Sequence, residues 1–212
     1  MAYSVKEIFY TLQGEGAQTG RAAVFCRFSG CNLWSGREED RASAVCRFCD
    51  TDFIGTNGPG GGRFESAADL AAAVSAQWPQ DEPYGQRYVV CTGGEPLLQL
   101  DRALIEALHA ERFAIAVESN GTIAAPDGLD WICISPKAGA VLRQCSGDEL
   151  KLVYPQQELE PEEFIQLPFR HFFLQPKDGP SQAEHTAMAV AYCKAHPQWR
   201  LSLQTHKLLG IP

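Results

Sequence analysis

The chain has 212 residues, of which 45% are hydrophobic and 21% are charged, values typical of a globular protein with one well-formed core. Its net charge of −8 argues against nucleic-acid binding, which requires a basic face. The first residues lack the basic stretch and apolar run of a signal peptide, and no apolar stretch approaches the length of a membrane span. We therefore expect a cytoplasmic protein with reduced cysteines, bound neither to nucleic acid nor to a membrane.

Short segments rich in β-branched and aromatic residues predict a series of strands separated by helices. The predicted strands lie at residues 3–10, 22–28, 87–91, 113–117, 131–134, 149–153, 171–174 and 201–204. A first helix begins at Ser66, with N-cap chemistry toward Asp69, and a second runs from about residue 98 to 109. A third begins at Ser181, with Glu184 as its capping-box partner.

The strand–loop–helix units are too few for a closed eightfold barrel. They predict an α/β fold, an incomplete TIM-like barrel of about six mostly parallel strands and about three helices. The sequence shows neither an internal repeat nor a linker, so we expect a single domain over residues 1–212.

Polar residues follow the ends of several predicted strands. They lie at 13–16, 92–96, 118–122, 135–137 and 175–178. In a parallel sheet such ends meet at one edge, where ligands bind. The strand-end segments together therefore predict a ligand site, whereas the segment 13–16 taken alone is better interpreted as a simple turn.

Three cysteines, Cys31, Cys46 and Cys49, are separated by fourteen and then two residues. Cys46 and Cys49 have the spacing of two ligands on one metal unit, and Cys31 must fold back across the intervening loop. Structural zinc takes four protein ligands, whereas a cubane iron–sulfur cluster on three thiolates leaves one iron open. The spacing alone leaves both alternatives, with zinc requiring a further His or Cys from elsewhere.

Three cysteines ahead of a strand-terminal Gly93-Gly94-Glu95-Pro96 are the pairing that marks radical S-adenosylmethionine enzymes. The chain departs from their commonest spacing, Cys-x3-Cys-x2-Cys, through a modified cluster loop at residues 29–62. Over most of its length it resembles the 7-carboxy-7-deazaguanine synthases of the queuosine and deazapurine pathway, in which loose spacing is a known variant. The resemblance favours a 4Fe–4S cluster over zinc.

The resemblance implies that Cys31, Cys46 and Cys49 hold the cluster and that its open iron chelates S-adenosylmethionine. The residues it assigns to that cofactor are Phe48, which would lie against the adenine, together with Gly94, Glu95, Ser135, Pro136, Lys137, Gln175, Pro176, Lys177 and Asp178. Members of the family also use magnesium. Thr51 matches the magnesium position, and Asp50 would accept hydrogen bonds from water on that ion.

The implied activity is that of a lyase converting 6-carboxy-5,6,7,8-tetrahydropterin to 7-carboxy-7-deazaguanine with loss of ammonia. A flavodoxin-like or ferredoxin-like protein would supply one electron. Cleavage of the cofactor would then give methionine and a 5′-deoxyadenosyl radical, which takes a hydrogen atom from the pterin before the cofactor is regenerated. The resemblance also implies a homodimer.

The expected substrate-binding residues are Leu12, Gln13, Gly14, Glu15, Arg27, Thr92, His206 and Pro212. Arg27 would pair with the substrate carboxylate, and its alternative is a salt bridge to one of the many acidic residues. Pro212 would offer a terminal carboxylate to the NH groups of the substrate. Other activities considered are a different small-substrate radical enzyme, a glycyl-radical activase and a non-catalytic zinc or iron–sulfur scaffold. The short chain favours a small substrate.

Overall fold

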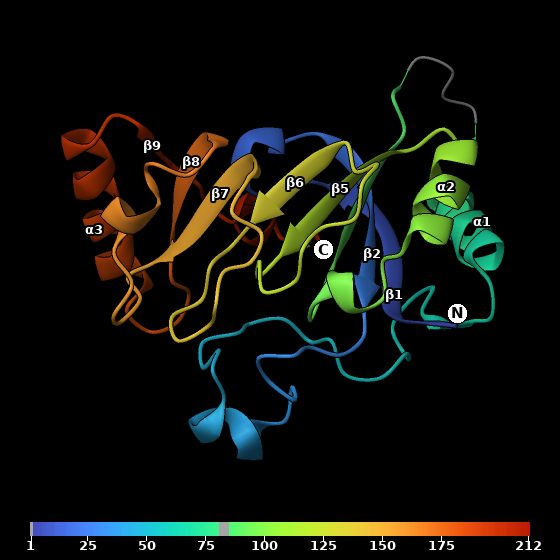
Figure 1. The fold of residues 1–212 in the computed structure, drawn as a ribbon, viewed down its shortest axis with the longest axis horizontal. Coiled ribbons are helices and arrows are strands. Elements are labelled where there is room, and N and C mark those ends of the chain that lie inside the picture. Colours follow the sequence, from blue (N-terminus) through green and yellow to red (C-terminus); the bar gives the residue numbers. More distant parts are fainter. Residues whose placement is uncertain (1, 81–84) are drawn as a thin grey trace.

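The computed structural model describes residues 2–80 and 85–212, which form one twisted sheet with the three longer helices packed on its outer face (Figure 1). The strand order is β3-β1-β2-β4-β5-β6-β7-β8-β9. The strands are β1 (Tyr3–Leu12), β2 (Ala22–Phe28), β3 (Gly62–Phe64), β4 (Tyr88–Gly93), β5 (Ala114–Ser119), β6 (Trp131–Ile134), β7 (Gly147–Tyr154), β8 (Phe169–Pro176) and β9 (Trp199–Leu201). The α-helices are α1 (Ala67–Gln77), α2 (Arg102–Ala110), α3 (Gln182–Ala195) and α4 (Thr205–Leu209).

The pairing of the strands confirms the predicted α/β fold and the incomplete barrel. From β2 through β4 to β9 all neighbours are parallel, whereas β1 is antiparallel to both β2 and β3. No pairing within the described residues joins β3 to β9, so the sheet is open.

The described residues contain nine strands rather than about six. The three-residue strands β3 and β9 are too short to show a period of their own. For the same reason the last strand was predicted at 201–204 and overlaps β9 only at Leu201. Helix α4, which occupies five residues of the tail, was not predicted.

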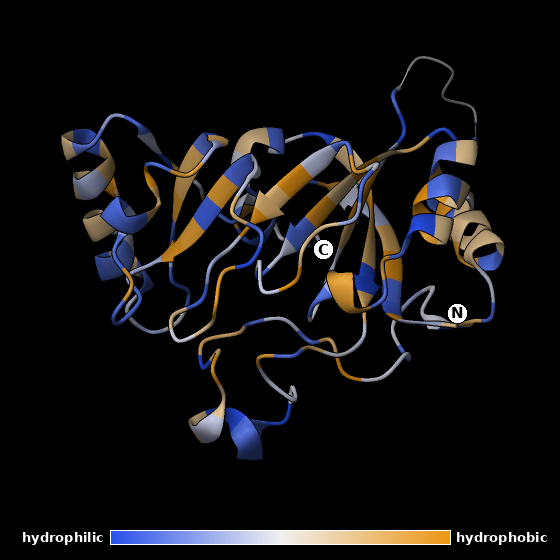
Figure 2. Ribbon diagram, in the orientation of Figure 1, coloured by the Kyte–Doolittle hydropathy of each residue, from blue (hydrophilic) through white to orange (hydrophobic). Residues whose placement is uncertain are grey.

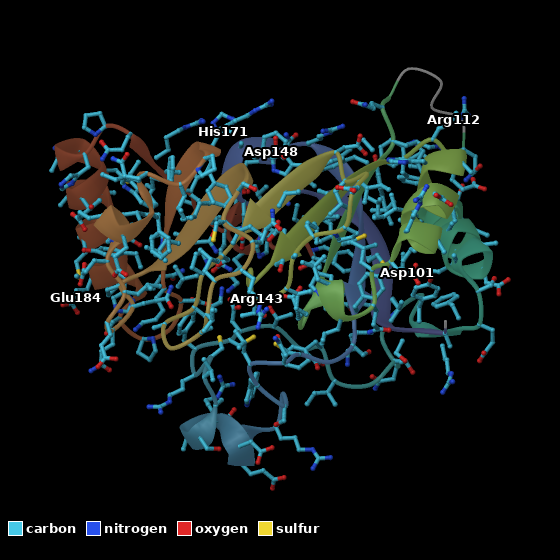
Figure 3. All side chains as sticks on the ribbon, in the orientation of Figure 1. Asp101, Arg112, Arg143, Asp148, His171 and Glu184 are labelled. Atoms are coloured by element: carbon cyan, nitrogen blue, oxygen red, sulfur yellow. The ribbon has the colours of Figure 1, made fainter. Side chains whose placement is uncertain are left out.

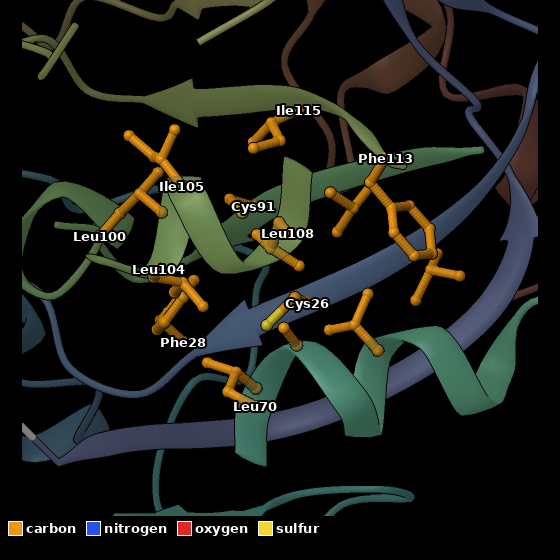
Figure 4. Close-up of a cluster of buried hydrophobic side chains, with 14 of the residues drawn as sticks. Cys26, Phe28, Leu70, Cys91, Leu100, Leu104, Ile105, Leu108, Phe113 and Ile115 are labelled. Carbon is orange, nitrogen blue, oxygen red and sulfur yellow. The ribbon is translucent and has the colours of Figure 1, made fainter. Parts of the chain in front are cut away.

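The main hydrophobic core lies between α1, α2 and the outer face of β1, β2, β4 and β5 (Figure 4). Leu104 and Leu108, one helical turn apart on α2, are 0% and 1% exposed, and they share this core with Leu70 of α1. Cys26 and Cys91 are buried here too, so both thiols serve as small apolar side chains. A second core joins α3 to β7 and β8.

The starts of the three longer helices differ in their capping. Ser66 caps α1 as predicted, with its hydroxyl accepting from the Asp69 amide at 3.1 Å. The capping box predicted at Ser181 is wrong, because the Ser181 side chain makes no capping hydrogen bond to α3. Asp101, labelled in Figure 3, caps α2 through the Leu104 amide and also accepts from the Tyr3 hydroxyl at 2.7 Å, which fastens α2 to β1.

Helices α2 and α3 mix polar and apolar residues along their length, as expected for helices with one face on a sheet (Figure 2). Within residues 2–80 and 85–212, no helix has both the length and the apolar character needed to cross a membrane.

The inner face of the sheet, opposite the helices, carries buried charges. On β7, Glu149 and Lys151 alternate with Leu150 and Leu152, which belong to the core beneath α3. Both charged residues are only 3% exposed. Buried charges require partners, so this face of the barrel indicates a polar site rather than a second apolar core.

Candidate active site

A cavity of about 350 Å³ lies on the inner face at the carboxyl ends of the parallel strands, a size suited to a small molecule. Its wall comes from the ends of successive strands and from the cluster loop. The predicted site residues that line it are Leu12, Gln13, Gly14, Glu15, Arg27, Cys31, Cys46, Phe48, Cys49, Thr51, Thr92, Gly94, Ser135, Lys137, Gln175, Pro176, Asp178, His206 and Pro212. The fold thus gathers segments far apart in the sequence around one space.

Three predicted cofactor residues, Glu95, Pro136 and Lys177, do not line this cavity. The Glu95 carboxylate is 0% exposed and accepts hydrogen bonds from the Leu97 amide and the Ser119 hydroxyl. It also accepts from the backbone amide of residue 120. Burial raises the pKa of Glu95 by more than these hydrogen bonds lower it, so the net pKa is raised. Its side chain therefore ties the loop after β4 to the loop after β5.

Pro136 and Lys177 lie behind the cavity wall and make backbone contacts that support it. The Pro136 carbonyl accepts from the Gln156 side chain at 3.2 Å. The Lys177 amide donates to the Tyr154 carbonyl, and the Lys177 carbonyl contacts the ring of His185. Both residues shape the loops after β6 and β8 through their backbones.

Gly94 allows a close contact within the protein. A Cβ atom at Gly94 would lie 2.1 Å from the Gly30 carbonyl oxygen and 2.8 Å from Cβ of Cys31. The preceding Gly93 has φ +135°, which disfavours any other residue. The two glycines thus let the end of β4 pass directly against the start of the cluster loop.

The three predicted cluster ligands border the same side of the cavity. The Cys46 thiol donates to Cys49, which raises the pKa of Cys46 and lowers that of Cys49 to about 6. Burial raises the pKa of Cys31, and its sulfur accepts from the Leu33 amide at 3.4 Å. The wall of one cavity thus contains an interacting pair of thiols and a third thiol.

The donor set fits a cluster better than a single ion. Across the described ranges, no group of three or more His, Cys, Asp and Glu residues is placed to hold one metal ion. A tetrahedral zinc needs its ligands at one point, whereas a cubane takes each thiolate on a different iron. Three soft sulfur donors around one cavity therefore match an iron–sulfur cluster.

The cluster loop has its own support, centred on Arg41. The guanidinium donates to the carbonyls of Arg47 and Cys49 at 3.0 and 3.2 Å and lies 4.1 Å from the centre of the Trp34 ring. Trp34 in turn packs edge-on against Phe53. These contacts explain how a loop with fourteen residues between two cysteines keeps them at the cavity.

Lys137 is a half-buried cation beside the cysteines. Its ammonium donates to the carbonyl and hydroxyl of Ser135 at 2.6 and 2.7 Å. Burial lowers the pKa of Lys137, against the opposing influence of Cys46 and Cys49. The loop after β6 thus places a positive charge next to the thiols.

The segment Gln13–Glu15 reaches the cavity by an unpredicted route. Leu12 pairs with Ala22 in the antiparallel β1–β2 ladder, so the segment leaves the sheet at the edge opposite the carboxyl ends of the parallel strands. It then turns inward, with the Gly14 carbonyl accepting from Thr205 and the Gly16 amide donating to Ser202. The expectation that all polar segments share one edge is therefore wrong for this one.

Lys151 joins two carboxylates in the cavity wall. Its ammonium lies 2.5 Å from Glu15 Oε2 and 3.0 Å from Glu118 Oε2. Burial would raise the pKa of Glu15, but the charge and hydrogen bond of Lys151 outweigh it, and the pKa is lowered. Burial raises the pKa of the neighbouring Glu149.

Arg27 has a carboxylate partner and still faces the cavity. Its Nε lies 2.7 Å from Glu7 Oε1, and the two side chains are 21% and 23% exposed. Both residues line the cavity. The salt-bridge alternative for Arg27 is therefore present in the structure together with the position expected of a substrate ligand.

The C-terminal segment covers one side of the cavity. The Lys207 ammonium lies 2.6 Å from both Asp50 and Asp178, which joins the cluster loop to the end of β8. His206 packs so tightly on Gly14 that a Cβ atom there would lie 2.2 Å from the ring Nδ1. The Thr11 hydroxyl donates to the Pro212 carbonyl at 2.9 Å.

Sequence reasoning assigned no site role to several cavity residues. They are Glu7, Lys151, Gln204 and Lys207, whereas Glu118 belongs to the predicted strand-end segment 118–122. A signal for Lys151 was present, because Glu149 and Lys151 are charges at alternate positions in a strand of a parallel sheet, where both faces are covered. Glu7 of β1 and Gln204 beside α4 gave no such signal.

Comparison with known proteins gives relatives over the whole chain. No family model matches. A 7-carboxy-7-deazaguanine synthase of Caulobacter vibrioides is 67% identical, with all of both chains covered, and one of Bordetella pertussis is 65% identical with the same coverage. The chain belongs to the 7-carboxy-7-deazaguanine synthase family. The crystal structure of QueE from Escherichia coli matches the fold with a TM-score of 0.69 at 26% identity, covering 96% of this chain and 94% of that one.

Membership in the synthase family confirms the resemblance seen in the sequence. The match to QueE agrees with the open, mostly parallel sheet. The identity to these two relatives extends over the full length of the chain, so the family assignment covers all of its strands and loops.

Proposed function

We propose that this chain is a radical S-adenosylmethionine lyase that converts 6-carboxy-5,6,7,8-tetrahydropterin to 7-carboxy-7-deazaguanine with loss of ammonia, in queuosine biosynthesis. The full-length identity to proteins named as that synthase supports the proposal. The observation that carries it in the structure is one cavity lined both by three thiols and by acidic, amide and cationic side chains.

In this proposal Cys31, Cys46 and Cys49 hold a 4Fe–4S cluster. The residues that would surround S-adenosylmethionine are Phe48, Gly94, Ser135, Lys137, Gln175, Pro176 and Asp178, with Glu95, Pro136 and Lys177 supporting their loops. Cluster and cofactor together supply a carbon radical that removes one hydrogen atom from the substrate.

The protein itself would position the substrate and exclude water. Gln13, Glu15 and Thr92 face the cavity with hydrogen-bonding groups suited to a pterin ring, and Arg27 offers a charge to its carboxylate. Leu12, Gly14, His206 and Pro212 complete this side of the wall. The Lys207 ion pairs hold the C-terminal segment over the cavity and limit the entry of water.

We further propose the cytoplasm as the location, a homodimer as the assembly and a flavodoxin-like or ferredoxin-like protein as electron donor. All eight cysteines are free, which suits a reducing compartment. The cluster loop lies at one side of the molecule (Figure 1), where a donor has access. The continuous sheet from β3 to β9 supports a single domain over residues 1–212.

The other activities considered from the sequence have less support. A glycyl-radical activase must accommodate a protein substrate, and the cavity of about 350 Å³ suits a small molecule. A zinc scaffold needs ligands meeting at one ion, an arrangement not found within the described residues.

The test is an anaerobic assay of the reconstituted protein with the tetrahydropterin, S-adenosylmethionine and a chemical reductant. We expect 7-carboxy-7-deazaguanine and ammonia in equal amounts, with the cofactor recovered. Cofactor cleavage that continues without any change in the pterin would contradict the proposed substrate.

Magnesium is expected to stimulate turnover through Thr51. Thr51 lines the cavity, while the carboxylates of Asp50 and Asp52 beside it are engaged by Lys207 and Lys6 at 2.6 and 2.8 Å. One hydroxyl is a weak site alone, so substrate oxygens and water must complete the six ligands that magnesium prefers. Asp50 would then accept hydrogen bonds from that water.

The measurement compares turnover with and without magnesium in the wild type, Thr51→Ala and Thr51→Ser. We expect stimulation of the wild type and of Thr51→Ser, which keeps the hydroxyl, and little stimulation of Thr51→Ala, with equal iron content in all three. Unchanged wild-type turnover after removal of all divalent ions would show that the chain has no such site.

A further inference from the structure

Lys151 is the least expected charge in the cavity wall. It lies in the middle of β7, its side chain is 4% exposed, and both neighbours, Leu150 and Leu152, belong to the apolar core. Burying a lysine is costly, and a buried ion pair is often less stable than apolar residues of the same volume. Its presence at the cavity is therefore poorly explained by stability alone.

The ammonium of Lys151 connects carboxylates from two separate segments. Glu15 arrives from the turn after β1, and Glu118 belongs to β5. Each carboxylate has one oxygen on Lys151 and the other on an amide: Gln204 Nε2 lies 3.1 Å from Glu15 Oε1, and Gln13 Nε2 lies 2.8 Å from Glu118 Oε1.

Both carboxylates keep acceptor capacity toward the cavity. Their side chains are 14% and 22% exposed, and both line the cavity wall. An ionised carboxylate has about four lone-pair sites, so one cation and one amide leave sites open. A pterin presents adjacent N–H donors on its pyrimidine ring, and two ionised carboxylates are matched to such an edge.

We propose that Lys151 is a positioning residue, which fixes Glu15 and Glu118 as a pair of acceptors for the N–H edge of the substrate. The inference rests on the proposed function and deepens it. Lys151 acts through the two carboxylates, because its ammonium forms ion pairs with them rather than with the pterin.

The charges around Glu15 set its protonation state once Lys151 is removed. The groups that act on Glu15 are Lys151 of β7, His206 of α4 and Gln204, and Gln204 also contacts Asp50. Lys151 itself faces Glu118 of β5, Cys133 of β6 and Glu149 of β7 as well as Glu15. With Lys151 gone, burial would raise the pKa of Glu15, opposed only by the Gln204 hydrogen bond and the charge of His206 among the influences on this group. A protonated Glu15 has no negative charge and carries an O–H donor on one oxygen, so it accepts more weakly from the substrate N–H groups until rising pH restores its charge.

The experiment measures binding of 6-carboxy-5,6,7,8-tetrahydropterin to the cluster-loaded enzyme with S-adenosylmethionine, by anaerobic equilibrium dialysis between about pH 6 and about pH 8.5. For Lys151→Met we expect about 10- to 100-fold weaker binding at the acidic end and recovery as pH rises. Wild-type binding should change by less than about threefold over this range, because Lys151 keeps Glu15 ionised. Cluster content and cofactor affinity should stay unchanged.

Two further variants distinguish positioning from loss of stability. Arg87→Met removes a largely buried cation that contacts Ser75 and Glu111 far from the cavity, and its pterin binding should match the wild type at every pH. Glu149→Gln/Lys151→Met removes one buried acid together with the cation, so the double variant should fold even if Lys151→Met does not. Its pterin binding should recover with rising pH in the same way as expected for Lys151→Met.

The outcomes separate this inference from the proposed function. A wild type that does not bind the pterin overturns both. A wild type that binds it, together with lysine-free variants whose binding is unchanged, or reduced equally at every pH, overturns only the positioning role of Lys151.

Discussion

Replacing Cys31, Cys46 or Cys49 by alanine, one at a time, is expected to abolish the brown iron–sulfur chromophore of the reconstituted protein. The three thiols border one side of the cavity, and Cys46 and Cys49 are in hydrogen-bonding contact. A cubane on three thiolates has no spare protein ligand, so two are insufficient to retain it. The measurement is iron and sulfide content with the visible absorption spectrum, and the wild type should bind about four irons per chain.

The remaining cysteines serve as matched controls. Cys145 is exposed and Cys193 half-buried, so their alanine variants should keep the full cluster and normal stability. Cys26, Cys91 and Cys133 are buried, and their variants should keep the cluster while losing some stability through packing. A wild type that binds one tetrahedral zinc and assembles no cluster, or a Cys31→Ala variant with full iron content, would contradict the assignment.

The sequence was sufficient for those parts of the fold whose pattern is local. The strands of the parallel sheet are buried on both faces and appear as apolar runs, and the Ser66 cap was visible from its side-chain chemistry. The missed elements depend on distant partners. Gly62–Phe64 becomes a strand only by pairing with Tyr3–Val5, and α4 forms where Thr205 meets the carbonyl of Gly14.

Prediction of the site from the sequence is limited in the same way, because contacts between distant segments leave no local pattern. Residues after β4, β5, β6 and β8 reach the cavity because parallel strands end at one edge, a rule that needs no coordinates. The rule fails for Gln13–Glu15, because the direction of β1 is set by its antiparallel ladder with β2. It also failed for Glu95, where a motif residue turns into the protein, and it gave no means of pairing Lys151 with a carboxylate 136 positions away.

Arg27→Ala is expected to weaken binding of the tetrahydropterin by about 10- to 150-fold and to leave the affinity for S-adenosylmethionine unchanged. The factor corresponds to the loss of a charge-assisted hydrogen bond of about 1.5–3 kcal/mol. Only Nε of Arg27 is engaged by Glu7 at 2.7 Å, and a guanidinium has five N–H donors, so others are available for a substrate carboxylate. Arg27→Lys should recover part of the affinity, because a lysine keeps the charge but lacks the two-pronged geometry.

Glu7→Gln decides whether the arginine acts on the substrate or only on its neighbour. It removes the charge of the internal partner and keeps a side chain of the same size, so the Arg27 guanidinium stays at the cavity with its charge free for the pterin. If Arg27 binds the substrate, Glu7→Gln should bind the pterin within about threefold of the wild type, while Arg27→Ala loses at least about tenfold. Equal losses in the two variants, or equal losses for pterin and cofactor in Arg27→Ala, would make the Arg27–Glu7 pair a structural element of the β1–β2 ladder.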